Sequence, residues 1–163
     1  MRVAIMGTGG LGGMLGGLQA RAGHEVSFIA RGGTLRALQN RGLRVQLRDE
    51  EFRLDVHAVE DPAEIGPVDL VWLCVKTYDL DAAARQILPI VGPETMVITL
   101  QNGVEAPDEV GEIVGLEHVV AGINLGGATM TNPGMVSAKA RRRQVMLGEP
   151  HGGKSARTQR LAE

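Results

Sequence analysis

Hydrophobic residues in this chain occur mainly in short uninterrupted runs, separated by stretches that end at glycine or proline. The runs at residues 2–6 and 68–75 show no alternation, which is typical of strands buried on both faces of a parallel sheet. The stretches between such runs have helical character, so the pattern predicts alternating strands and helices. The predicted strands are residues 2–6, 25–30, 68–75, 95–100 and 118–124, and the predicted helices are a segment ending near residue 22 and residues 34–40, 79–88, 106–114 and 154–163.

Two further pairs of segments have a different pattern. Residues 43–47 and 52–56 alternate apolar and polar side chains on either side of a charged turn, which predicts a hairpin with one polar face. Residues 135–138 and 142–147 predict two late strands joined by a turn. The predicted fold is therefore α/β, Rossmann-like and doubly wound, with a mostly parallel sheet and a late antiparallel strand pair.

The first predicted strand runs directly into a turn that reads G-x-G-x-x-G. The turn consists of Gly7, Thr8, Gly9, Gly10, Leu11 and Gly12. Here Gly7 permits a tight turn, Gly9 lets the backbone approach a pyrophosphate, and Gly12 lets the helix pack close to the strand. The N–H groups at the helix start then face the bound anion. Because a strand precedes the turn and a helix and second strand follow it, we predict a dinucleotide-binding βαβ unit rather than a merely glycine-rich turn.

The helix that follows this turn is unusually rich in glycine. Each glycine costs about 1 kcal/mol of helix propensity relative to alanine. The spacing of three and four residues places several of them on one face, where a close approach to the sheet would offset that cost. The glycines concerned are Gly12, Gly13, Gly16 and Gly17.

The end of the second predicted strand indicates which dinucleotide is bound. An NAD site usually has an acidic residue there to bind the ribose 2′-hydroxyl, but this chain has Arg31 and no acid. A guanidinium forms charge-assisted hydrogen bonds with a 2′-phosphate, which a carboxylate would repel. We therefore predict NADP as the cofactor. The alternative is that Arg31 is a solvated charge at a strand end.

Composition limits the other functions that need to be considered. The 163 residues suit one domain, and a formal charge of −2 gives no general attraction to nucleic acid or an anionic membrane. No apolar run approaches the roughly 20 residues of a membrane span, and no signal peptide precedes the first strand. The single cysteine, Cys74, lies in an apolar run and is predicted to be an inert core thiol in a reducing compartment, so we expect a cytoplasmic protein. No metal site is predicted, because the four histidines lack metal-ligand spacing.

A second glycine-rich motif competes with the first one. Residues 148–155 satisfy G-x-x-x-x-G-K-S, the phosphate loop of ATPases and GTPases, between a predicted strand and a predicted helix. Only eight residues follow Ser155, so no later strand supplies the aspartate that holds Mg²⁺ in such enzymes. We interpret this motif as a coincidence in a glycine-rich linker.

Several motifs recur together, in this order, in one protein family. They are the glycine turn, Phe28-Ile29-Ala30-Arg31-Gly32, Cys74-Val75-Lys76-Thr77, Leu100-Gln101-Asn102-Gly103-Val104, Gly126-Gly127-Ala128-Thr129 and Asn132-Pro133-Gly134. On these residues the chain resembles the 2-dehydropantoate 2-reductases, or ketopantoate reductases, over essentially its whole length. It is similar to their N-terminal NADP-binding domain.

The resemblance implies that hydride from NADPH reduces the 2-keto group of ketopantoate, giving pantoate for pantothenate and coenzyme A synthesis. It assigns the pyrophosphate to the turn from Gly7 to Gly12 and the 2′-phosphate to Arg31. It also implies that Lys76 contacts the cofactor and that Asn102 lies near the nicotinamide ribose and the substrate. Both residues follow predicted strands, where an open α/β sheet presents its ligand crevice. Without the resemblance, Lys76 is a solvated lysine and Asn102 part of a plain turn.

The chain departs from the family in one respect. Family members carry a second, helical domain with the lysine that donates a proton to the substrate carbonyl. We therefore expect an NADP-binding domain at residues 1–150, the start of a linking helix at 151–163, and no catalytic residue in this chain. Two alternatives remain: a stand-alone NADPH-binding module without chemistry, and a related reductase of another 2-keto or 3-hydroxy acid. No sequence pattern indicates an oligomeric state.

Overall fold

The computed structural model describes residues 1–140, 144–153 and 155–162. Its first elements are β1 (Arg2–Met6), α1 (Gly10–Arg21) and β2 (Glu25–Ile29). Strands β1 and β2 are parallel, with Val3 opposite Val26, because α1 carries the chain back across the sheet between them. The predicted opening βαβ unit is confirmed.

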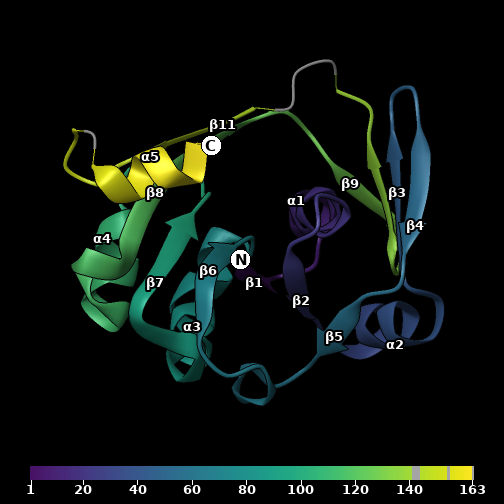
Figure 1. Ribbon diagram of the computed structural model, residues 1–163, viewed down its shortest axis with the longest axis horizontal. Helices are drawn as coiled ribbons and strands as arrows, with labels where there is room; N and C mark the ends of the chain where they lie inside the picture. Colours follow the sequence, from purple (N-terminus) through teal and green to yellow (C-terminus); the bar gives the residue numbers. More distant parts are fainter. Residues whose placement is uncertain (141–143, 154, 163) are drawn as a thin grey trace.

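Among the described residues, seven strands form the main sheet, in the order β11-β8-β7-β6-β1-β2-β5 (Figure 1). The pairs from β5 to β8 are all parallel, and β11 pairs antiparallel with β8. From β5 to β8 this is the strand order of dinucleotide-binding folds, and its direction reverses between β1 and β6. The remaining strands are β5 (His57–Val59), β6 (Val68–Leu73), β7 (Val91–Thr99), β8 (Val119–Leu125) and β11 (Gln144–Gly148).

Helices cover both faces of this sheet, as the doubly wound prediction requires. Helices α3 (Leu80–Gln86) and α4 (Ala106–Val114) pack on the face that carries Ala4 and Val71, and α1 packs on the opposite face. The other helical segments are α2 (Gly32–Arg41), α5 (Ala156–Ala162) and the short turns η1 (Pro62–Glu64), η2 (Thr77–Asp79), η3 (Leu88–Ile90) and η4 (Leu116–His118).

A smaller sheet lies on the far side of α1. In the described part of the chain its strand order is β4-β3-β10-β9. Its hairpin of β3 and β4 is the predicted one, and β10 adds in parallel to β3 and antiparallel to β9. Its strands are β3 (Leu43–Leu47), β4 (Glu51–Leu54), β9 (Thr129–Asn132) and β10 (Met135–Ala138).

One sequence prediction about these strands is wrong. The two late strands are not partners, because β10 belongs to the smaller sheet and β11 to the main sheet. Strand β10 instead extends the smaller sheet beside β3, while β11 pairs with β8 and forms the edge of the main sheet. The late antiparallel pairs are therefore β9 with β10 and β8 with β11. Residues 141–143 of the predicted second strand lie outside the described residues.

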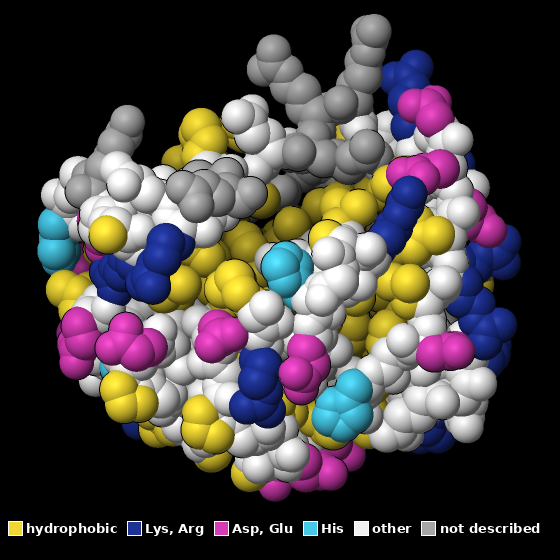
Figure 2. Space-filling view, viewed as in Figure 1, with side chains coloured by type: hydrophobic (Ala, Val, Ile, Leu, Met, Phe, Trp, Pro, Cys, Tyr) yellow, Lys and Arg dark blue, Asp and Glu magenta, His cyan; other side chains and the backbone are white. Residues whose placement is uncertain are grey.

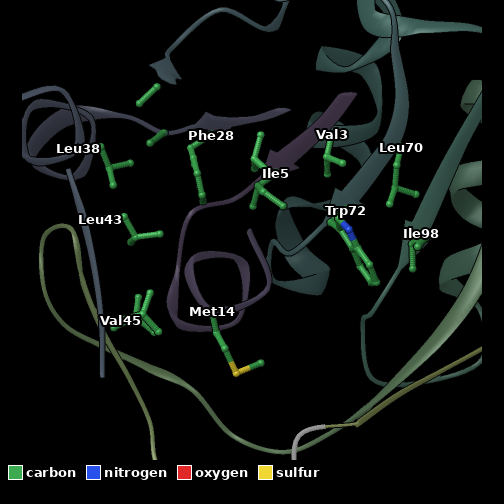
Figure 3. Close-up of a cluster of buried hydrophobic side chains, with 14 of the residues drawn as sticks. Val3, Ile5, Met14, Phe28, Leu38, Leu43, Val45, Leu70, Trp72 and Ile98 are labelled. Atoms are coloured by element: carbon green, nitrogen blue, oxygen red, sulfur yellow. The ribbon is translucent and has the colours of Figure 1, made fainter. Parts of the chain in front are cut away.

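Helix α1 is held between the two sheets, and its glycines make this possible (Figure 1). A Cβ added at Gly16 would lie 2.5 Å from the Phe28 ring of the main sheet, and one at Gly13 would lie 2.6 Å from Cγ2 of Val136 in the smaller sheet. The predicted close approach is confirmed, but on two faces of the helix rather than one. Figure 3 shows the core on both sides of Met14, with residues of the main sheet and of β3. Burial against both sheets offsets the low helix propensity of glycine.

Candidate functional site

Two adjoining cavities in the described part of the chain lie at the carboxyl ends of the strands, beside the point where the strand order reverses. The larger has a volume of about 650 Å³, and the smaller about 260 Å³. The larger is bounded by the start of α1, the segments after β6 and β7, and the connection from β8 to β9. The smaller lies between the glycine turn, the end of β2 and the start of α3. Val75 lines both cavities, so it forms part of the wall between them.

The glycine turn lies where the two cavities meet. Gly7 has a φ of +96°, and an added Cβ would lie 3.0 Å from the backbone carbon of Cys74, so a side chain is excluded there. At Gly9, the residue before α1, no heavy atom of the described residues other than its chain neighbours lies within 4 Å of an added Cβ. Gly9 thus faces open space beside the larger cavity, where a ligand can approach the backbone.

Two further contacts shape this turn. The buried Thr8 hydroxyl donates to the carbonyl oxygen of Ile29 at 3.1 Å and so ties the turn to the end of β2. In the described part of the chain, the first intrahelical hydrogen bond of α1 runs from the N–H of Gly13 to the carbonyl oxygen of Gly9, at 2.9 Å. The three N–H groups of α1 before it have no intrahelical acceptor, and such groups bind anions. A Cβ at Gly10 would lie 2.2 Å from the carbonyl oxygen of Ala128. The sequence did not indicate this contact, because Ala128 reaches α1 only through the crossing between the two sheets.

Arg31 lines the smaller cavity and is exposed. Its guanidinium Nη2 donates to the side-chain oxygen of Gln86 on α3, at 3.0 Å. Thr34 and Asp79 line the same cavity. The sequence places Arg31 at a strand end but gives no sign that Gln86 and Asp79 lie beside it. Their place depends on how α3 packs, and no motif marks it.

Lys76 and Asn102 both line the larger cavity, and both are exposed. Lys76 comes three residues after the end of β6, and Asn102 three residues after the end of β7. Parallel neighbouring strands end at the same edge of a sheet, so the two residues share one crevice, as their positions in the sequence predicted.

Cys74 lies one residue beyond β6 and lines the larger cavity, rather than lying inside a strand as the sequence suggested. The residue is half-buried, and its side chain packs against the core. Burial raises the pKa of the Cys74 thiol to about 12, so the thiol stays protonated at neutral pH. This agrees with the predicted inert thiol.

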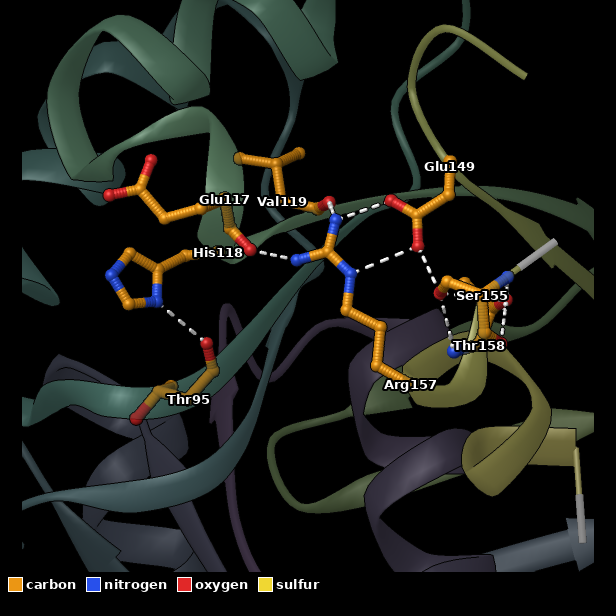
Figure 4. Close-up of polar contacts among 8 residues, drawn as sticks. All are labelled: Thr95, Glu117, His118, Val119, Glu149, Ser155, Arg157 and Thr158. Atoms are coloured by element: carbon orange, nitrogen blue, oxygen red, sulfur yellow. Dashed lines mark hydrogen bonds and ion pairs between the residues drawn. The ribbon is translucent and has the colours of Figure 1, made fainter. Parts of the chain in front are cut away.

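The second glycine motif is built differently from a phosphate loop (Figure 4). The Ser155 hydroxyl, which would bind Mg²⁺ in such a loop, donates to the carboxylate of Glu149. Arg157 binds the same carboxylate, with Nε at 3.0 Å from Oε1, and lowers the pKa of Glu149 to about 2. A permanent carboxylate in the motif repels phosphate, so these contacts argue against a nucleotide site there. Lys154 lies outside the described residues.

Two other kinds of feature, metal-ligand clusters and membrane-spanning helices, concern the described residues as a whole. Among the described residues, no three His, Cys, Asp or Glu side chains are grouped so that they could hold a metal ion. In that same part of the chain, no helix is both long and apolar enough to cross a membrane. On the face shown in Figure 2, charges of both signs lie around the rim, and hydrophobic side chains gather in the hollowed middle.

Comparison with known proteins agrees with this geometry. The sequence profile of the family described as ketopantoate reductase PanE/ApbA matches residues 3–152. A 2-dehydropantoate 2-reductase of Mesorhizobium japonicum is 34% identical over 100% of this chain and 56% of its own length. The crystal structure of 2-dehydropantoate 2-reductase from Geobacter metallireducens has a TM-score of 0.93 and 32% identity, over 99% of this chain and 54% of its own.

A second activity occurs among the similar structures. The ternary structure of D-mandelate dehydrogenase with NADH and anilino(oxo)acetate has a TM-score of 0.90 and 26% identity, over 99% of this chain and 53% of its own. The chain thus spans about half the length of the relatives it matches.

Proposed function

Because this chain belongs to the ketopantoate reductase (PanE/ApbA) family of NAD(P)-dependent oxidoreductases, we propose that it is the NADP(H)-binding part of a 2-keto acid reductase with ketopantoate as substrate. The observation that carries the proposal is the pair of adjoining cavities with the glycine turn between them. Bound NADPH would supply the hydride that reduces the keto group. The residues present fit such a dinucleotide, because Gly9 faces open space at the junction of the cavities.

Each cavity suits one half of the dinucleotide. The smaller takes the adenosine half, with Arg31 donating to the 2′-phosphate. The turn from Gly7 to Gly12 receives the pyrophosphate on its free N–H groups. The larger cavity takes the nicotinamide half, with Lys76 at the cofactor and Asn102 at both the nicotinamide ribose and the keto acid.

The chain contributes no proton donor in this proposal. Reduction of a ketone needs an acid near the forming alkoxide, and general acid catalysis typically contributes roughly 10²- to 10⁴-fold in rate. We place that acid in a second, helical domain outside these 163 residues, since the relatives are about twice as long. Residues 1–150 then form the cofactor domain, and residues 151–163 lead into a linking helix. The 163 residues alone should bind NADPH without turnover.

The first experiment measures the preference of the chain for NADPH over NADH. NADPH should bind more tightly than NADH, and Arg31→Ala should remove most of the difference, roughly 10- to 150-fold, because a hydrogen bond between charged groups is worth about 1.5–3 kcal/mol. Arg36→Ala is the matched control, since Arg36 is also exposed on α2 but lines neither cavity. Calorimetric titration of the unmutated chain and both variants with NADPH and with NADH measures the six affinities. Equal affinity of the unmutated chain for NADPH and NADH would contradict the choice of NADP.

Assays of enzymatic turnover distinguish the remaining candidate functions. The 163 residues should show no ketopantoate-dependent oxidation of NADPH, whereas a chain extended through the proposed second domain should show it. The similarity to D-mandelate dehydrogenase favours one second candidate, a reductase of aromatic 2-keto acids. Activity of the extended chain on phenylglyoxylate but not on ketopantoate would select it. Absence of activity on any 2-keto acid would instead favour a binding module without chemistry.

A further inference from the structure

The side chain of Gln101 makes three hydrogen bonds to the backbone, two around the end of β6 and one just after β7. Its Nε2 donates to the carbonyl oxygens of Leu73 and Val75, at 2.9 and 3.0 Å. Its Oε1 accepts from the N–H of Leu100 at 3.1 Å. Both amide hydrogens and the amide oxygen are thus engaged, and the two carbonyl acceptors determine which end of the amide carries nitrogen.

These bonds lie just beyond the point where β6 and β7 separate. The last pair of that ladder is Leu73 opposite Thr99. On the other side, the N–H of Cys74 donates to the carbonyl oxygen of Met6 in β1 at 2.8 Å. The segment after β6 is therefore held on one side by the backbone of β1 and on the other by the side chain of Gln101.

The segment held in this way separates the two cavities and carries a proposed cofactor ligand. A Cβ on Gly7 would lie 2.8 Å from Cγ1 of Val75, so this valine packs directly against the glycine turn. Lys76 is the next residue after Val75, and Asn102 is the next after Gln101. One side chain thus links the two loops that present Lys76 and Asn102 to the larger cavity.

We propose that Gln101 is a positioning residue that fixes Lys76 and Asn102 relative to each other and so sets the affinity for the nicotinamide half of the dinucleotide. This inference rests on the proposed NADP(H) binding. Glutamine is suited to the role because it offers two donors and an acceptor at the end of a flexible stem. Glutamate would direct an acceptor at two carbonyl oxygens, and methionine would offer no donor.

The test compares two ligands, of which only NADPH contains the nicotinamide half. NADPH occupies both cavities in the proposal, whereas adenosine 2′,5′-bisphosphate occupies the smaller one alone. Gln101→Met and Gln101→Glu should each lower NADPH affinity by about tenfold or more, because two part-buried carbonyl groups lose their donor and the loops are no longer held together. Affinity for the bisphosphate should change by less than about twofold. Gln39→Met is the matched control, since Gln39 also donates to a backbone carbonyl, that of Ala58, but lines neither cavity.

The outcomes are distinguishable. If the unmutated chain binds neither ligand, the proposed function itself fails. If it binds both, then unchanged NADPH affinity in the Gln101 variants, or equal losses for both ligands, overturns the positioning role. NMR of the unmutated protein gives a test that needs no variant: both Nε2 hydrogens of Gln101 should exchange slowly and shift with NADPH but not with the bisphosphate. Fast exchange of these hydrogens would also overturn the role.

Discussion

Glu149→Gln should destabilise the protein in a pH-dependent way. Arg157 lowers the pKa of Glu149 from 4.5 to about 2, with further help from the Ser155 hydroxyl. Such a shift corresponds to roughly 3 kcal/mol of native-state stability at neutral pH, because each pKa unit is worth about 1.4 kcal/mol. The Glu149 and Arg157 side chains are only 18% and 23% exposed, so solvent screens this pair weakly. We expect a loss of about 2–3 kcal/mol at pH 7.

The sign of the pH dependence follows from the lowered pKa. Above about pH 4.5 both the native and the unfolded carboxyl are ionised, and the full stabilisation is present. As the pH falls from 4.5 towards 2, the unfolded chain takes up a proton before the native protein does, so the stabilisation is lost. The difference between the unmutated protein and Glu149→Gln should therefore shrink over that range.

Urea unfolding followed by far-ultraviolet circular dichroism at pH 7, 5, 4 and 3 measures this difference. The control is Glu51→Gln, because Glu51 pairs with Arg44 but the two side chains are 39% and 49% exposed. An exposed pair contributes about 1 kcal/mol or less. The reasoning is refuted if Glu149→Gln loses no more stability than the control at pH 7, or if its deficit is the same at every pH.

Three further predictions concern the Cys74 thiol, two of the N-terminal glycines and nucleotide binding at the second glycine motif. A thiol-specific reagent at pH 8 should modify Cys74 slowly in the native protein and rapidly in urea, and stability should fall above about pH 9, where only the unfolded thiol ionises. Gly13→Ala should cost about 1–3 kcal/mol in urea unfolding through its clash with Val136, whereas Gly9→Ala should leave stability unchanged and weaken NADPH binding in a calorimetric titration. The unmutated chain should show no Mg²⁺-dependent binding of ATP by calorimetry, and binding that Lys154→Ala abolishes would contradict the interpretation of the second glycine motif.

Local patterns predicted most of the main sheet. Each buried parallel strand contains its own apolar run, and the glycine turn lies between a strand and a helix that are both evident in the sequence. Strands β5 and β9 could not be found in this way. Strand β5 has only three residues, and β9 consists mainly of exposed residues, so neither has a hydrophobic pattern of its own. They are strands because a neighbouring strand offers them hydrogen bonds.

The β3–β4 hairpin of the smaller sheet was predicted, but the pairing of β10 with it could not be, for a related reason. Its central pairing places Arg44 beside Met135, and nothing local to either segment specifies so distant a partner. The same distinction between local and distant determinants applies to the residues of the candidate site. Lys76 and Asn102 could be located because strand ends define the crevice, whereas the contacts of Gln86 and Gln101 depend on side-chain directions that only the packed structure determines.

The position of α1 between two sheets also affects the order in which the protein folds. Its glycine-rich sequence forms a helix poorly by itself, and the contacts that stabilise it come partly from Ala128 and Val136, more than one hundred residues later in the chain. Closing a loop of that length is entropically costly and slow. During synthesis, α1 therefore waits for segments more than one hundred residues later, and the nucleotide-binding turn reaches its final structure only after β10 has emerged.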